Sequence, residues 1–505
     1  MENNFIKNMK KETNYIQTEN GAVAAKTTLN AVYDLFALGG AYRNRTKEDK
    51  ILLFKKAVEE NPLLALKCLF YLRAIRRGQG ERDFFRTCYT WFCKEYSAVA
   101  AQNLHLIPYY GRWDDLYCAI DTPVEQEMFN FIEKQLGQDS LSLKNEKEGV
   151  SLLGKWLKSE NTSSKVSREL GTKTRKALKL TSKQYRKILS ALRTRINIVE
   201  KLMSENKWDE IKFDKIPSKA GLIYRNAFAH NDMIAQKYAD FINSKDTNVK
   251  AATLYPYEIV SKVTEHIDYW NKDINITNIE RATLNKYWEN QKDYLDGQSC
   301  RTMCVIDTSG SMTCKGRGVR PIDVAISLGM YCAERIGEPF KNYFISFSSR
   351  PQLIEVEGID FCDKVRRIYE QNLCENTDLG AVFSLLLHLI SDQNLREEEI
   401  PNQIIVISDM EIDDGSCWND DEERTYEMQK IREKWTAAGY KMPKLVYWCV
   451  ESRHNIILED AENPDVTFVS GCSPVIFKAV LNGKSGIDLM LEVLTDSYYD
   501  PIKFD

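Results

Sequence analysis

Apolar residues recur at helical spacing from the N-terminus to about residue 296. The pattern is clear in the stretches LNAVYDLFALGG, DKILLFKKAVEENPLLALKCLFYLRAI, RDFFRTCYTWFCKEY and VEQEMFNFIEKQL. Glycine and proline separate these stretches at Gly39, Gly40, Pro62, Gly78 and Pro108. Helices of this length with short connections predict the stacked helix pairs of an α-solenoid, although no fixed repeat period is visible.

The pattern changes after residue 300. Short β-branched or aromatic runs now alternate with helical stretches; the runs are RTMCVID, NYFISFS, NQIIVIS, KLVYWCV and VTFVS. This alternation predicts an α/β fold with a mostly parallel sheet and helices on both faces. The polar segment NQKDYLDGQSCR separates the two patterns. We therefore predict a helical-repeat domain over residues 1–296 and an α/β domain over residues 297–505.

Length and composition fit a folded protein of more than one domain. The chain has 505 residues, of which 43% are apolar and 28% charged. No apolar run reaches the length of a membrane span, and the first residues lack the apolar core of a signal peptide. The thirteen cysteines are scattered, without a CxxC pair. We expect a cytoplasmic protein with reduced thiols and no membrane partner, and we expect it to be a monomer.

Oxygen-bearing side chains lie at three predicted strand ends. Asp307, Ser309 and Ser311 occupy alternate positions after the run CVID, Thr377 precedes a helix, and Asp409 follows the run IIVIS. Alternate residues of an extended segment point the same way, and parallel sheets bind ligands at the carboxyl ends of their strands. Carboxylate and hydroxyl oxygens suit a hard divalent cation, Mg²⁺ or Mn²⁺. We therefore predict one metal site formed by these five residues, with Asp409 bound directly or through water.

Other interpretations of these residues remain open. Asp307 and the two serines could instead cap the next helix, and Asp378 suits an N-cap better than a metal ligand. The acidic run MEIDDGSCWNDDEE, residues 410–423, is interpreted as a solvated loop before an acid-rich helix N-terminus, and not as a second metal site.

The sequence offers no catalytic constellation. It has no paired general acid and base, no nucleophile–histidine pair and no phosphate-binding loop. A nuclease or other hydrolase that uses the metal is a weaker alternative, because a hydroxyl-rich site for one metal does not suit two-metal chemistry. We therefore expect no enzymatic activity.

Positive charge is concentrated in residues 155–201, although the whole chain has a net charge of −4. This segment contains fourteen lysines and arginines and only three glutamates. Such a concentration on helices, with hydroxyl groups interleaved, is typical of phosphate binding, and we predict RNA as the ligand. A solvated helix face is the alternative, and Tyr185 suits the core better than base stacking. The predicted RNA-binding residues are Lys173, Arg175, Lys176, Lys179, Lys183, Arg186, Lys187 and Arg193.

Several motifs, taken in order, resemble a known family. The helical part contains FYLRAIRRGQGERDFFRTCYTWF, LIPYYGRWDDLY, SLLGKWLKS, YRKILSALRTRINIVEKLMSENKWDEI and IPSKAGLIYRNAF. Together with the α/β part, these resemble the family designated domain of unknown function 2828, which is similar to the Ro autoantigen, or TROVE, proteins. The α/β part also resembles von Willebrand factor A domains. Their metal-ion-dependent adhesion site, MIDAS, has the pattern Asp-x-Ser-x-Ser, Thr, Asp, which falls here on Asp307, Ser309, Ser311, Thr377 and Asp409.

The resemblance implies a fold and a mode of binding. Ro proteins are rings of HEAT-like helices closed by an A domain, and they bind small noncoding RNAs on the outside and the single-stranded ends of misfolded RNAs in the central hole. For this chain, the resemblance implies a ring in which the A domain also contacts the first helices, within about residues 20–90. It further implies that Mg²⁺ performs no chemistry and accepts a carboxylate from a protein partner.

Two arginine-rich motifs have separate interpretations. GRWDDL, residues 111–116, is interpreted as a buried polar link between helix pairs, with Trp113 as packing. Five arginines around the Gly78–Gly80 turn are candidates for facing phosphates; they are Arg73, Arg76, Arg77, Arg82 and Arg86.

The expected function is RNA binding without catalysis, in a ribonucleoprotein with small noncoding or misfolded RNA. The alternative is a protein-interaction scaffold, in which the A domain holds a partner carboxylate through Mg²⁺ and the basic helices are merely solvated. RNA binding with a steep salt dependence distinguishes the two, because a scaffold has no reason to show it.

Overall fold

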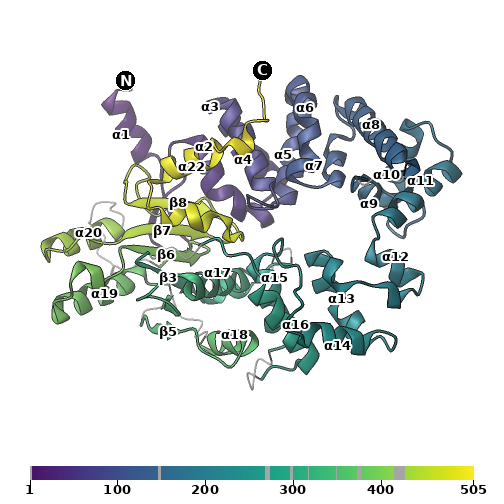
Figure 1. The fold of residues 1–505 in the computed structure, drawn as a ribbon. Helices are drawn as coiled ribbons and strands as arrows, with labels where there is room; N and C mark the ends of the chain where they lie inside the picture. The colour runs from purple at the N-terminus through teal and green to yellow at the C-terminus, as the bar shows by residue number, and fades with distance from the viewer. Residues whose placement is uncertain are drawn as a thin grey trace.

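The computed structural model describes residues 3–145, 149–267, 273–295, 300–314, 316, 318–347, 350–371, 377–413 and 427–505. Within them, a helical N-terminal region is followed by a C-terminal α/β region, as Figure 1 shows. The prediction of these two kinds of structure, in this order, is confirmed. The last helix of the first region ends at Glu289 and the first strand of the second begins at Thr302. Among the described helices, none combines the length and the apolar character that a bilayer crossing requires.

The N-terminal region is built from short helices. Side chains fix several of their starts: Thr46 and Thr181 accept backbone N–H groups of the first turns, and Asn61 does so ahead of Pro62. The α-helices are α1(Asn4–Glu12), α2(Ala31–Leu38), α3(Lys47–Glu60), α4(Pro62–Arg73), α5(Arg82–Glu95), α6(Ser97–Asn103), α7(Ile107–Tyr110), α8(Glu125–Lys144), α9(Leu153–Trp156), α10(Lys165–Ala177), α11(Ser182–Arg195), α12(Val199–Ser204), α13(Ser218–His230), α14(Ala235–Asn243), α15(Pro256–Thr264) and α16(Asn278–Glu289). The 3₁₀ helices are η1(Gly39–Asn44), η2(Leu104–Leu106), η3(Trp113–Ala119), η4(Trp208–Glu210) and η5(Phe213–Lys215).

These helices form an arc whose two ends both contact the α/β region (Figure 1). Helices close in the chain pack together; α3, for example, lies against α2, α4 and α5. At the start of the arc, α2 contacts β8(Val466–Ser470) and α22(Gly486–Leu494). At its end, α15 contacts α17(Pro321–Arg335). The contact between the first helices and the α/β region, which the resemblance predicts, is present.

The C-terminal region is built on a mixed sheet. Within the described residues its six strands have the spatial order β5-β4-β3-β6-β7-β8, and all neighbours are parallel except β4 and β5. The chain leaves β3 toward one edge and returns with β6 on the other side of β3, so the carboxyl ends of β3 and β6 flank a topological switch point. The strands are β3(Thr302–Asp307), β4(Tyr343–Phe347), β5(Leu353–Glu355), β6(Gln403–Ser408), β7(Lys444–Cys449) and β8. The remaining helices are η6(Gly310–Thr313), α18(Phe361–Glu370), α19(Leu379–Gln393), η7(Glu397–Glu399), α20(Glu427–Ala437), η8(Pro474–Ile476), α21(Phe477–Leu481) and η9(Ser497–Tyr499).

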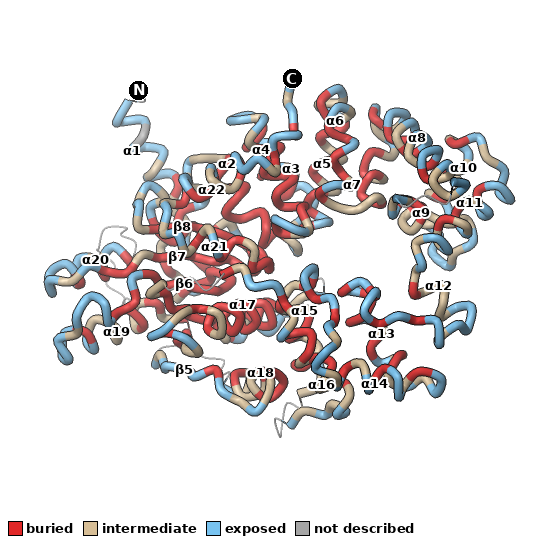
Figure 2. The backbone as a smooth tube through the Cα atoms, in the orientation of Figure 1, coloured by how far each residue is buried: buried red, intermediate tan, exposed pale blue. Residues whose placement is uncertain are grey.

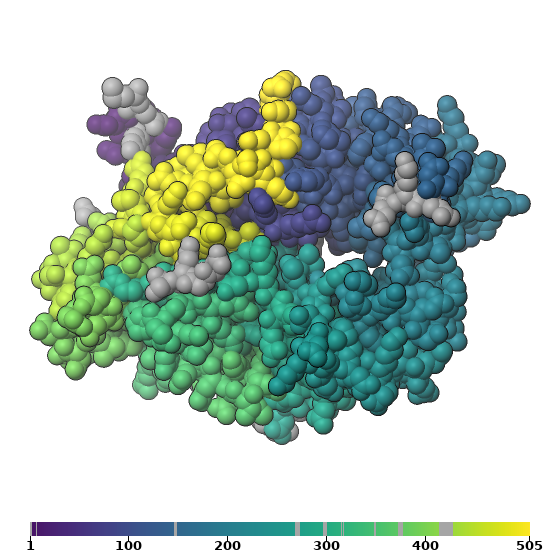
Figure 3. Space-filling view, in the orientation of Figure 1, coloured from purple at the N-terminus to yellow at the C-terminus, as the bar shows by residue number. Residues whose placement is uncertain are grey.

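The two regions share one buried core, which Figure 2 shows in red. Tyr33 of α2 is fully buried, and its hydroxyl accepts the backbone N–H of Phe468 in β8 at 2.8 Å. Gly40 donates its N–H to the Ser470 hydroxyl, and a Cβ at this position would lie 2.8 Å from the Ser470 carbonyl oxygen. Only glycine permits this approach. Figure 3 shows the C-terminal segment, in yellow, lying against the N-terminal helices.

A short hairpin joins the N-terminal segment to the carboxyl edge of the sheet. Its strands are β1(Tyr15–Gln17) and β2(Val23–Ala25). Gly21 forms a bridge with Asp413, and the Thr18 hydroxyl donates to the carbonyl of Ile412 at 2.7 Å. The hairpin therefore covers part of the edge at which the predicted metal ligands lie.

Candidate metal centre and nucleic-acid interface

The loop after β3 brings Asp307, Ser309 and Ser311 together. Oδ1 of Asp307 accepts the backbone N–H of Ser309 at 2.8 Å, and the hydroxyl oxygens of the two serines are 3.1 Å apart. Ser309 makes no side-chain cap for η6, and α17 begins after Arg320. These side chains therefore cap neither helix, and the capping interpretation is wrong.

Asp307 is fully buried beside a second carboxylate, Asp409. Burial, and then the charge of Asp409, raise the pKa of Asp307 to about 7, and hydrogen bonds from Ser408 and Ser309 offset them only in part. Ser408, the last residue of β6, donates its hydroxyl to Oδ2 of Asp307 at 2.6 Å. Sequence analysis missed Ser408 because nothing distinguishes it from any other inward position of a strand. Two neighbouring buried carboxylates, of which Asp307 has no cationic partner in the described ranges, favour a cation beside them.

Thr377 lies on the loop that precedes α19 and faces the loop after β6. Its backbone N–H donates to Asp413 at 2.7 Å and its hydroxyl donates to the carbonyl of Glu411 at 3.1 Å. The lone pairs of this hydroxyl oxygen stay available for a metal. Asp378 accepts the N–H of Ala381 at 2.8 Å and so caps α19, as predicted.

Arg453 belongs to this edge of the sheet, although sequence analysis did not identify it. It follows β7, and its guanidinium donates to Asp409 at 2.8 Å and contacts Glu19 at 2.7 Å. Because β7 is the neighbour of β6, its exit reaches the same edge; only the strand order reveals this. Since Arg453 holds one oxygen of Asp409, a contact between Asp409 and a metal through water is favoured over a direct one.

The donor set fits a hard divalent cation. Asp307 supplies a carboxylate and Ser309 and Ser311 supply hydroxyls from the same loop, and Thr377, whose hydroxyl contacts the loop that carries Asp409, would supply another. Few protein ligands, all of them oxygens, leave room for water or for a carboxylate from outside, as Mg²⁺ prefers.

The beginning of the acidic run 410–423 is buried, contrary to the prediction of a solvated loop. Met410, Glu411 and Ile412 are 3%, 2% and 2% exposed. The hairpin is the reason, because Glu411 accepts the backbone N–H of Glu19 at 2.7 Å. Residues 414–423 of the run lie outside the described residues.

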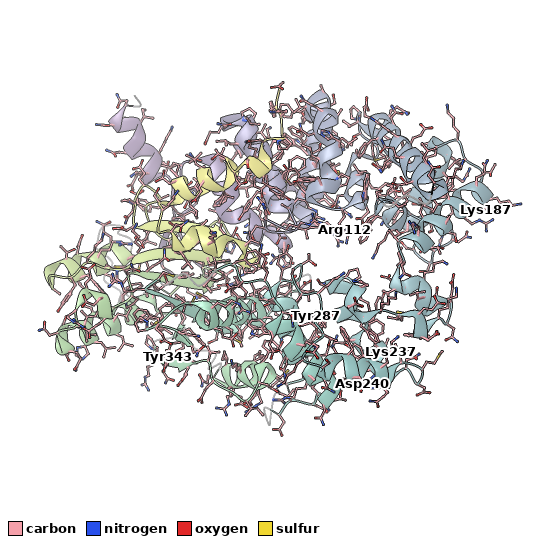
Figure 4. All side chains as sticks on the ribbon, in the orientation of Figure 1. Arg112, Lys187, Lys237, Asp240, Tyr287 and Tyr343 are labelled. Atoms are coloured by element: carbon pink, nitrogen blue, oxygen red, sulfur yellow. The ribbon has the colours of Figure 1, made fainter. Side chains whose placement is uncertain are left out.

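The basic segment forms α10 and α11, at the end of the molecule away from the sheet (Figure 1). Lys187 extends outward from this end (Figure 4). Five of the eight predicted RNA-binding residues are exposed on these helices and on the turn between them; they are Lys176, Lys179, Lys183, Arg186 and Lys187. None of these five forms an ion pair with another residue of the described ranges. They make one exposed group of cations, called the α10–α11 surface below.

The other three predicted residues have partners within the protein. Lys173 forms ion pairs with Asp121 and Glu125 at 2.6 and 2.7 Å. The guanidinium of Arg175 contacts Glu160 at 2.7 Å. Arg193 donates to three oxygens of the 154–159 segment at 2.9–3.0 Å. Arg175 and Arg193 hold the connection before α10 against the two helices, and Lys173 ties α10 to the start of α8.

Tyr185 is fully buried, and its hydroxyl donates to the carbonyl of Lys158 at 2.8 Å. The prediction of a core position rather than a stacking platform is confirmed.

The GRWDDL motif is a buried polar link, as predicted. Asp115 is fully buried and accepts hydrogen bonds from Arg73 at 2.9 Å and Arg86 at 2.7 Å. Asp114 pairs with Arg112 through two hydrogen bonds of 2.8 and 2.7 Å. Trp113 stacks on Phe131 at 5.6 Å between ring centroids, which is its predicted packing role.

The five arginines near the Gly78–Gly80 turn therefore differ in availability. Arg73 and Arg86 are bound to the aspartates of the link, and Arg77 lies 3.7 Å from Asp496. Arg76, Arg77 and Arg82 are exposed. Burial, and then the charges of Arg112 and Arg86, lower the pKa of Arg82, although Asp114 and Asp115 counteract them.

Fold and site together define a protein of two regions, a helical arc closed by an α/β region with a carboxylate–hydroxyl cluster at its switch point. The chain belongs to the family described as domain of unknown function DUF2828, whose sequence profile matches residues 18–128 and 150–312. This confirms the family expected from the sequence. A second profile, domain of unknown function DUF7788, matches residues 301–497. The chain is also similar to the uncharacterized protein L728 of Acanthamoeba polyphaga mimivirus, with 27% identity over 526 residues that cover 96% of this chain and 88% of that protein.

Proposed function

We propose that this protein binds RNA without catalysis, in the manner of the Ro proteins. In this proposal the helical arc is a HEAT-like ring, the α/β region is a von Willebrand A domain, and the RNA is a small noncoding or misfolded one. The proposal also places the protein in the cytoplasm.

The α10–α11 surface is the observation that carries the proposal. Between residues 165 and 195 the sequence has eleven lysines and arginines against one glutamate, Glu169. The five exposed cations defined above are close together on two consecutive helices and their turn. Like charges crowded on one surface repel one another, and a polyanion that binds there removes this repulsion and releases its own condensed counterions. The exposed side chains of Arg76 and Arg82 offer a second place where phosphates would be attracted.

The metal site has a separate role in the proposal. Asp307, Ser309, Ser311 and Thr377, with Asp409 through water, would hold Mg²⁺ or Mn²⁺ as a MIDAS. The cation would supply an open coordination position for a carboxylate of a protein partner. The hydrogen bonds of Asp307 with Ser309 and Ser408 keep its carboxylate oriented for this purpose.

The test is the salt dependence of RNA binding by the full chain, measured by fluorescence anisotropy. About five phosphate contacts give a slope of log K against log salt of about −3.5 to −4.5, or a loss of about 100- to 500-fold between 50 and 200 mM salt. Reversal of Lys176, Lys179, Lys183, Arg186 and Lys187 to Glu should abolish specific binding and flatten the slope. Arg175 and Arg193 are left unchanged because they hold the fold.

A matched control reverses five exposed lysines elsewhere; they are Lys47, Lys55, Lys56, Lys94 and Lys441. This variant has the same change in net charge and should keep at least a tenth of the affinity. Equal losses in both variants would show that net charge alone attracts RNA. No RNA binding by the unmodified chain at 50 mM salt, together with intact Mg²⁺ binding, would favour the protein-interaction scaffold.

A further inference from the structure

A second cluster of metal-ligating side chains lies next to the site described above. Glu19 comes from the turn of the β1–β2 hairpin, Glu411 from the loop after β6, and His454 from the loop after β7. One ligand atom of each lies within 4.8 Å of the others. Nδ1 of His454 is 3.0 Å from Glu411 and 3.6 Å from Glu19. We propose that this cluster binds a divalent transition metal, Zn²⁺ being the best match, with Glu19, Glu411 and His454 as its ligands.

The spacing agrees with the size of such a site. Zn²⁺ bonds to nitrogen and oxygen of about 2.0–2.1 Å at tetrahedral angles place ligand atoms about 3.3–3.4 Å apart. The distances from Nδ1 of His454 to Glu411 and to Glu19 are slightly shorter and slightly longer than this value. Small rotations of the exposed Glu19 and His454 side chains would complete the geometry. An imidazole with two carboxylates suits a borderline cation better than Mg²⁺, which selects oxygen ligands.

Each carboxylate of the cluster has one oxygen held and the other directed at His454. Oε2 of Glu411 accepts the backbone N–H of Glu19 at 2.7 Å, while Oε1 faces the imidazole. Oε2 of Glu19 pairs with Arg453 at 2.7 Å, while Oε1 faces the imidazole. Outer contacts of this kind orient metal ligands.

The loop that carries His454 is also fixed. The Ser452 hydroxyl donates to the carbonyl of His454 at 2.7 Å, and the Ser452 N–H donates to Ala41 at 3.1 Å. Arg45 donates to the carbonyl of Arg453. The N-terminal helices therefore hold this loop in position before any metal binds.

The charge of the cluster calls for a cation. Glu19 and Glu411 bring two carboxylates to the cluster, and the one guanidinium there, that of Arg453, is shared between Glu19 and Asp409. A divalent ion would neutralise these two carboxylates. Side chains of Glu19 and His454 are 41% and 52% exposed, so water can enter and fill the remaining coordination positions.

The competing explanation is an ion-pair network in which a protonated His454 bridges the two glutamates. Calorimetric titration of the full chain with ZnSO₄ separates the two. The protein is first stripped with a chelator and then kept in millimolar Mg²⁺, so that a hard-cation site is filled. We expect one Zn²⁺ per chain, and at least tenfold weaker binding in Glu19→Gln and in His454→Ala.

The controls come from the same chain. His388→Ala removes an exposed histidine 3.2 Å from Asp392 on α19 and should leave Zn²⁺ affinity unchanged. Asp307→Ala should also keep Zn²⁺ binding, so this proposal and the proposed MIDAS fail or succeed separately. Glu19→Gln removes an exposed carboxylate and so stays interpretable if a change at the buried Glu411 prevents folding. No saturable binding by the unmodified chain, or equal affinities of His454→Ala and His388→Ala, would overturn the proposal.

Discussion

Replacing Asp115 by Asn tests the buried polar link at its centre. Asp115 is 0% exposed, and Arg73, one of its partners, is 2% exposed. The carboxylate accepts from Nε of Arg73 at 2.9 Å, from Nε of Arg86 at 2.7 Å and from the backbone N–H of Arg112 at 2.8 Å. An Asn of the same shape offers one acceptor oxygen and turns an NH₂ group toward guanidinium donors. Arg73 would then stay buried with its charge uncompensated.

The expected cost follows from that uncompensated charge. Breaking a buried ion pair by removing one partner costs about 3–5 kcal/mol, a large share of the about 5–15 kcal/mol that stabilises a typical fold. Urea unfolding followed by circular dichroism at pH 7 measures the change in free energy of unfolding. The control is Glu59→Gln, which breaks an ion pair with Lys55 whose N–O distance is 3.8 Å. The side chains of Glu59 and Lys55 are 59% and 53% exposed. This substitution should cost less than about 0.5 kcal/mol.

The RNA affinity of Asp115→Asn is a second test of the buried polar link. If Arg73 and Arg86 serve the link, Asp115→Asn should leave RNA affinity unchanged at temperatures where the protein stays folded. If they face phosphates instead, removal of the competing carboxylate should tighten binding. A loss of less than about 1 kcal/mol, or tighter RNA binding, would refute the structural role of this motif.

Two further predictions concern single carboxylates. Millimolar Mg²⁺ should raise the melting temperature of the unmodified chain, because a ligand bound to the folded state alone stabilises it; Asp307→Ala should stay folded without this response, and an unchanged response would contradict the proposed ligand. Burial would raise the pKa of Asp114, but the hydrogen bonds and charges of Arg112 and Arg86 outweigh it and lower this pKa from 3.8 to about 2. A lowered pKa in the folded state gives stability that is present above pH 4 and is lost as the pH falls toward 2. The free energy of unfolding of the unmodified protein should therefore fall by about 2 kcal/mol more than that of Asp114→Asn over this pH range. Equal slopes for both proteins there would argue against it.

The parts of the site that are predictable from sequence are those set by one short segment. Asp307 ends a strand, and Ser309 and Ser311 directly follow it. Alternate residues there point the same way, so the sequence alone predicts that these three side chains lie together at the carboxyl edge of the sheet. The N-cap at Asp378 is local in the same sense. Arg453 and Glu19 depend instead on strand order and on a hairpin that reaches across the whole chain, and no local pattern carries that information.

The basic segment gives a different lesson. Its excess of charge is visible in the sequence, but which cations face water depends on the helix face. Tyr185 and Leu189 are buried one turn apart on α11, and Arg193 lies one further turn along the same side. The inward position of Arg193 is therefore predictable from sequence, because it follows Tyr185 and Leu189 at intervals of four residues. Arg175 is harder, because its partner Glu160 lies before the helix begins.

Charge segregation is what separates the two proposed activities. Carboxyl groups gather at the carboxyl edge of the sheet, where Asp307, Asp409, Glu411 and Glu19 lie and where Arg453 pairs with Asp409 and Glu19. Positive charge gathers on the α10–α11 surface, midway along the arc and at the side of the molecule away from the sheet (Figure 1). The net charge of −4 is a sum over the whole chain, so it reveals neither of these local concentrations. Screening over about 8–10 Å at physiological salt lets each surface act alone, so a cation bound at the sheet neither helps nor hinders RNA at the far helices.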